Sequence, residues 1–175
     1  MSLGVTLRAS VLVFVAALLQ ASLVSSLSID GGAPDVLLLV VVSLGLVRGS
    51  LSGAIAGFAG GLLLDVLTLE TLGVTSLVLT LAGFWAGRYS ETSRRDGRLD
   101  ALLSVTVIAV VAVGAGVALR LALGDDIDLR YAFVTTLVPS LALDLVLTVP
   151  VFWLVKKVAG SAPEPDRSRD VEVVV

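Results

Sequence analysis

The sequence predicts an all-α membrane protein, a bundle of six transmembrane helices. Of its 175 residues, 57% are apolar and only 15% are charged, and the mean hydropathy is +1.03. A soluble domain of this size has far more charged and polar residues. Six apolar stretches come close to the roughly 20 residues that cross a bilayer core. Basic residues also gather in alternate loops, as in multi-pass membrane proteins.

The expected spans all belong to one transmembrane domain, residues 1–159. They cover residues 9–27, 36–47, 51–69, 73–89, 101–123 and 132–155. The second span is short, because its 12 residues rise only about 18 Å. Spans two and three are therefore expected to form a tight helical hairpin.

Two segments at the ends of the chain need separate interpretation. The first span could instead be a cleaved signal peptide. Its features suit both interpretations, namely Arg8, the apolar run after it and the small residues near position 22. Residues 160–175 are rich in proline and charge, a composition typical of a disordered tail.

The distribution of basic residues predicts the orientation in the membrane. Ten of the twelve Lys and Arg residues fall on one side of the expected spans. These are Arg8, Arg48, Arg88, Arg94, Arg95, Arg98, Lys156, Lys157, Arg167 and Arg169. By the positive-inside rule that side is the cytoplasm, so both termini are expected there.

The composition excludes much of enzyme chemistry. Cysteine and histidine are both absent, which removes thiol nucleophiles, imidazole ligands and histidine proton relays. Asp96 and Asp100 have the spacing of a carboxylate pair that could hold a metal and a lipid diphosphate, but they stand in a loop with four arginines. We interpret that loop as solvated or as binding anionic lipid. We expect no enzyme activity, cofactor, metal or nucleic-acid partner.

A glycine stripe marks the third span. Gly53, Gly57 and Gly61 recur every fourth residue, so they share one helix face and let another backbone approach closely. The stripe either packs inside the bundle or contacts another subunit. Gly83 and Gly87 repeat the motif on the fourth span.

Asp65 extends the stripe and lies about 6 Å inside the outer end of the third span. An ionisable group at that depth must face protein or water. Arg120 on the fifth span lies at a similar depth, so the two residues are candidate ion-pair partners. The alternatives are a ligand site at Asp65 and an Arg120 side chain that reaches the interface alone.

Asp144 is the most costly residue for the membrane, because it lies about 18 Å from the outer end of the sixth span. Gln20 and Thr80 are polar residues at similar depth, and Thr148 lies one turn away. A hydrogen bond that fixes one helix against another and a ligand or proton site are both open interpretations. Pro150 and a second proline flank Asp144 and could bend the span.

A series of short motifs gives the chain a family resemblance. They are Pro34-Asp35, the Gly-Leu-Val-Arg-Gly run at 45–49, Gly53-xxx-Gly57, Gly61-Leu-Leu-Leu-Asp65, and Leu72-Gly73. In order, spacing and total length this chain resembles the bacterial rod shape-determining protein MreD family.

The resemblance implies a non-enzymatic membrane scaffold of the cell-elongation machinery. Its implied partners are MreC, the MreB filament, a glycosyltransferase and a class B transpeptidase that build lateral peptidoglycan, together with membrane lipid. It also implies a fold like the substrate-binding subunits of energy-coupling-factor transporters. A small-molecule or lipid-binding transporter subunit, with Asp65, Asp144 and Gln20 as polar anchors, is therefore the alternative. The short outer loops favour the scaffold.

Overall fold

The computed structural model describes residues 3–26, 34–69, 71–92 and 138–160, together with scattered positions between 107 and 122. These parts of the chain form helices, with no strand among them, which confirms the all-helical class. The helices are α1 (Leu3–Ser26), α2 (Val36–Arg48), α3 (Ser50–Thr68), α4 (Val74–Thr92) and α7 (Val138–Ala159). Most of the expected fifth span, the start of the sixth, the loop at 93–100 and the tail lie outside the described residues. The count of six spans stays a prediction.

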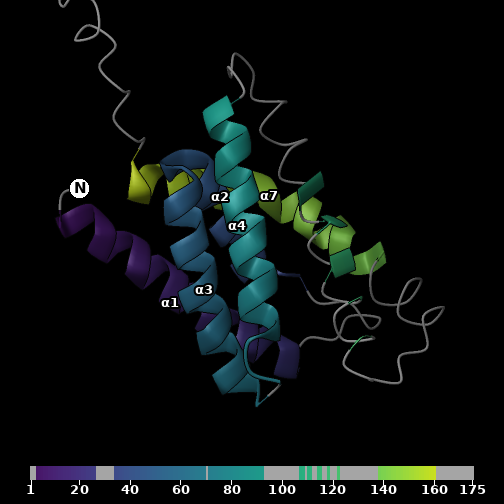
Figure 1. The fold of residues 1–175 in the computed structure, drawn as a ribbon. Coiled ribbons are helices and arrows are strands. Elements are labelled where there is room, and N and C mark those ends of the chain that lie inside the picture. Colours follow the sequence, from purple (N-terminus) through teal and green to yellow (C-terminus); the bar gives the residue numbers. More distant parts are fainter. Residues whose placement is uncertain are drawn as a thin grey trace, which may run out of the picture.

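Helix α2 is the centre of the packing. Ten consecutive residues, from Leu37 to Leu46, are buried. Helices α1, α3, α4 and α7 all contact α2. In Figure 1, α3 and α4 run side by side in front of α2, while α1 and α7 cross behind. Because neighbouring helices cover α2 on all sides, each of its faces can be apolar, which agrees with the Leu and Val run of its sequence.

Gly49 makes the turn between α2 and α3. Its φ of 92° lies in the left-handed region, which costs a glycine little, and α3 begins at the next residue. Its N–H donates to the carbonyl of Gly45, at the end of α2. The two helices therefore form a tight hairpin at the expected position.

Two described helices are long and apolar enough to cross a membrane, at Gly4–Ser22 and at Ser50–Thr68. Helix α2 is apolar but has only 13 residues, which rise about 20 Å. A bilayer core measures about 30 Å, so α2 is too short to cross it unaided.

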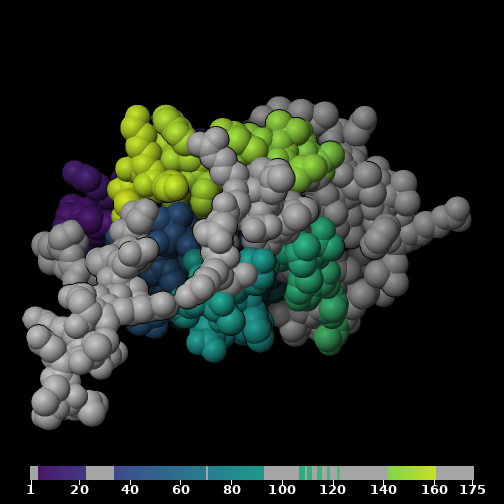
Figure 2. Space-filling model, turned by 90° about the horizontal axis from the view of Figure 1, so that it is seen from above, coloured from purple at the N-terminus to yellow at the C-terminus, as the bar shows by residue number. Residues whose placement is uncertain are grey.

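The basic end of the bundle is the end where α2 and α3 are joined. Arg48 there donates through Nη1 to the carbonyl of Ala159, 2.8 Å away at the end of α7. Ser90 near the end of α4 donates to the carbonyl of Leu46. The first turns of α1 lie at this end too, because Thr6 and Arg48 line one groove. Figure 2 shows this face, with the last turns of α7 (yellow) beside α1 (purple).

Candidate functional site

The glycine stripe of α3 lies directly against α4. A Cβ atom at Gly53 would overlap the backbone of Gly83, and one at Gly57 would overlap the backbone of Leu79. At Gly61 it would meet the backbone of Ser76. The stripe therefore packs inside the protein, where the backbone of α4 covers it, and is not open to another subunit.

The glycines of α4 face the same interface. A Cβ at Gly83 would overlap the backbone of Gly53, and one at Gly87 would overlap the backbone of Ser50. Gly45 on α2 also packs against Gly83. Small residues from three helices thus bring the backbones of α2, α3 and α4 together, the way helices pack where lipid supplies no hydrophobic driving force.

The N-terminus of α2 is capped by its own N-cap residue and by side chains from two other helices. The carboxylate of Asp35 accepts from the N–H of Leu38, 3.0 Å away. Gln20 on α1 accepts from the N–H of Val36 at 2.8 Å through Oε1. Asp144 on α7 accepts from the N–H of Asp35 at 2.7 Å through Oδ1. We call Gln20, Asp35 and Asp144 the α2 cap.

The α2 cap satisfies backbone donors that have no partner within their own helix. Since the acceptor side chains come from α1 and α7, these donors lie between helices and are partly shielded from solvent. The side chains of Gln20 and Asp144 replace the missing water. Both are buried, with 6% and 2% of their surface exposed.

The structure also shows where the other predicted neighbours of Asp144 lie. Thr148 donates to the carbonyl of Asp144 at 2.7 Å, within α7. Thr80 donates to the carbonyl of Ser76 within α4, so its hydroxyl serves its own helix. Among the described residues, Oδ2 of Asp144 has no hydrogen-bond partner.

Asp65 closes the turn between α3 and α4. Its Oδ2 accepts from the N–H of Gly73 at 2.8 Å, and the residue is 1% exposed. Its Oδ1 has no partner in the described part of the chain. Arg120, the expected ion-pair partner, lies outside the described residues, so that pair stays a prediction.

Glu91 caps α3 from another helix. Gly49, the N-cap residue of α3, has no side chain, and Oε1 of Glu91 on α4 accepts instead from the N–H of Ser50 at 2.8 Å and from its hydroxyl at 2.9 Å. Glu91 lies beyond the apolar part of α4. These hydrogen bonds, together with nearby Arg88, lower the pKa of Glu91 below its ordinary value. Glu91 is not predicted by the sequence, because the missing side-chain cap at Gly49 is its only local signal.

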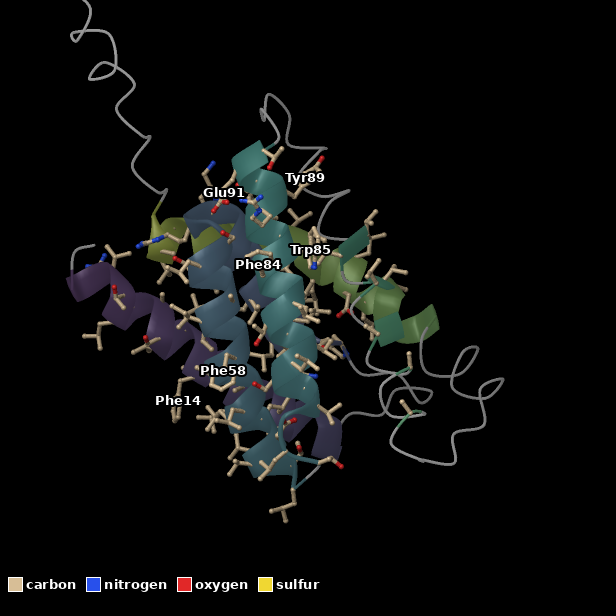
Figure 3. All side chains as sticks on the ribbon, in the orientation of Figure 1. Phe14, Phe58, Phe84, Trp85, Tyr89 and Glu91 are labelled. Carbon is tan, nitrogen blue, oxygen red and sulfur yellow. The ribbon has the colours of Figure 1, made fainter. Side chains whose placement is uncertain are left out.

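Two apolar grooves lie on either side of α1. The α1–α3 groove has a volume of about 290 Å³, and its lining mixes large apolar side chains, among them Val13, Leu44 and Ile55, with six small residues. These are Ala9, Ser10, Ser52, Ala56, Ala59 and Gly60. Phe14 on α1 and Phe58 on α3, both more than half exposed, lie on this side of the protein (Figure 3).

The α1–α7 groove is larger, about 470 Å³, and runs between α1, α2 and α7. Its walls are Leu and Val side chains, with Arg8 as its one charged member. Neither groove is lined by Gln20, Asp65 or Asp144. In the described part of the chain, Gln20, Asp65 and Asp144 therefore bind backbone at helix ends and turns, and α1 forms a wall of both grooves.

No set of three or more acidic side chains in the described part of the chain could hold a metal ion. Buried apolar helices, close glycine packing and capped helix ends together define a helical membrane protein. The family model for the rod shape-determining protein MreD matches residues 2–158, so the chain belongs to the MreD family. No curated protein and no solved structure matches the chain significantly. Membership of this family gives the chain a role in determining rod shape.

Proposed function

We propose that this protein is a non-enzymatic scaffold of the cell-elongation machinery, which binds the single transmembrane helix of MreC in the α1–α3 groove. Through MreC it would work beside the MreB filament, the glycosyltransferase and the class B transpeptidase that build lateral peptidoglycan. The proposal includes six spans in the inner membrane, with both termini in the cytoplasm, a transmembrane domain of residues 1–159 and a tail of residues 160–175.

The observation that carries the docking proposal is the small-residue surface of the α1–α3 groove. Helices associate in lipid through small residues, because these let two backbones come close enough for van der Waals contact and hydrogen bonds. Here Ala59 and Ser52 of α3 and Ala9 and Ser10 of α1 line the same groove, whereas Gly60 is already packed against Val13 and Leu37. The glycine stripe of α3 cannot serve this purpose, because α4 already occupies it.

The alternative, a transporter subunit that binds a small molecule, has less support. Such a subunit needs a cavity with a few converging polar groups. The candidate anchors Gln20, Asp65 and Asp144 each accept a hydrogen bond from a backbone N–H and line neither groove. The likeness to energy-coupling-factor subunits stays a prediction.

Co-purification with MreC in mild detergent tests the proposal. Ala59→Trp fills the α1–α3 groove from an exposed position, and Ala142→Trp places the same bulk on an exposed position of α7 outside both grooves. We expect Ala59→Trp to reduce the recovered MreC at least tenfold, while Ala142→Trp recovers it fully. Equal recovery with both variants would contradict docking in this groove. Helix content and elution volume of the variant alone would show that it folds.

A further inference from the structure

The walls of the α1–α7 groove differ in kind from those of the α1–α3 groove. They combine Val11 and Leu19 of α1, Val40 of α2, and Val151 and Leu154 of α7. Almost the whole lining is hydrocarbon, and Ala16 is its only small residue. Branched side chains keep another backbone at a distance, so this groove is poorly suited to a second helix.

One end of the groove is positively charged. Arg8 of α1 lines it at the basic end of the bundle, and Val158 in the last turns of α7 lines it too. Lys156 and Lys157 are exposed on the same turn of α7 as Val158. The ammonium of Lys157 lies 5.0 Å from the ring centre of Trp153, an arrangement common at the membrane interface. Figure 2 shows these turns of α7 next to α1.

This combination of hydrocarbon walls and a cationic end matches an anionic phospholipid. We propose that the α1–α7 groove binds one such lipid, with an acyl chain along Val11, Val40 and Leu154 and the phosphate beside Arg8. Basic pockets between transmembrane helices bind anionic head groups, and each Arg or Lys near the surface contributes about 1 kcal/mol to such binding. The apolar walls alone would accept any lipid, so the selectivity for negative charge comes from the basic end. The proposal does not depend on MreC.

Native mass spectrometry of the full-length protein tests the site. The protein is exchanged from detergent into mixed micelles with phosphatidylglycerol or with phosphatidylcholine, and the number and affinity of retained lipids are measured. We expect one phosphatidylglycerol to be retained in preference to phosphatidylcholine. Arg8→Gln should weaken phosphatidylglycerol binding about fivefold and leave phosphatidylcholine unchanged. Arg88→Gln removes an exposed arginine outside the groove and is the matched control.

A second pair of variants tests the apolar part of the groove. Val11 and Val66 are both 54% exposed, but only Val11 lines the groove. Val11→Trp should displace the retained lipid, and Val66→Trp should not. Equal retention of the two lipids, or equal loss with both members of either pair, would overturn the proposal. A Val11→Trp variant that keeps its lipid but loses MreC would assign the groove to the protein partner instead.

Discussion

The α2 cap predicts that two substitutions of Asp144 differ in their effect on stability. In Asp144→Asn the amide oxygen can still accept from the N–H of Asp35, so the backbone donor keeps its partner. In Asp144→Leu the donor stays buried with no acceptor. Because the present bond is 2.7 Å long and its acceptor Asp144 is only 2% exposed, its loss should lower the stability measurably.

The size of the effect follows from the hydrogen bond. A buried donor left without a partner costs about 1–3 kcal/mol. We therefore expect Asp144→Leu to lose about 1–3 kcal/mol of stability, while Asp144→Asn stays within about 1 kcal/mol of the natural protein. In a chain of 175 residues, 1 kcal/mol shifts the Tm by about 2–4 °C. The Leu variant should then melt about 2–12 °C lower.

Thermal unfolding in detergent, followed by tryptophan fluorescence, measures both variants. The chain has two tryptophans, and Trp153 lies on α7, the helix that carries Asp144. Gln20→Leu should behave like Asp144→Leu, because Gln20 caps the neighbouring N–H of Val36. If Asp144→Asn melts as low as Asp144→Leu, the negative charge itself is required, and capping does not explain how Asp144 stabilises the protein.

Three further predictions concern helix contacts and ends. Gly57→Ala should lose about 1–3 kcal/mol by forcing α3 away from α4, while Gly4→Ala, with no atom within 4 Å of the new Cβ, leaves the Tm unchanged. Glu91→Gln should lower the Tm at pH 7 but leave it unchanged well below pH 4.5. The pKa of Glu91 is depressed in the folded state, so the stabilisation from its carboxylate is lost as the carboxylate protonates. A Tm difference that persists in acid would contradict this. Arg48→Met should lose about 1–2 kcal/mol by removing the cation at the end of α7, and an unchanged Tm would count against that role.

The sequence predicted the helical class and the α2–α3 hairpin because apolar runs and glycine turns are local signals. It also identified Asp144 and Gln20, since polar residues in a lipid-facing run are costly wherever they point. Their partners could not be found the same way. Both side chains bind backbone N–H groups of α2, and every residue except proline carries such a group, so residue types do not reveal which one is bound.

The glycine stripe is a second case in which the sequence predicts a contact but not its partner. The spacing of Gly53, Gly57 and Gly61 indicates a close helix contact but not the identity of the second helix. The structure supplies α4, whose own glycines at 83 and 87 face the stripe. Glu91 was missed because it caps α3 from 41 residues away, beyond the reach of any local capping motif.

The N-terminus of α2 explains why an acidic residue can be buried on α7. The first turn of a helix carries N–H groups without partners in the helix, and no apolar side chain can satisfy them. Pro34, just before the cap, has no N–H and removes one donor, but the donors of Asp35 and Val36 remain. Acceptors must then come from neighbouring helices, and Gln20 and Asp144 supply them. Each hydrogen bond also fixes a neighbouring helix against α2: Gln20 holds α1, and Asp144 holds α7. The cap of α2 therefore helps to set the position of α1, which forms a wall of both grooves.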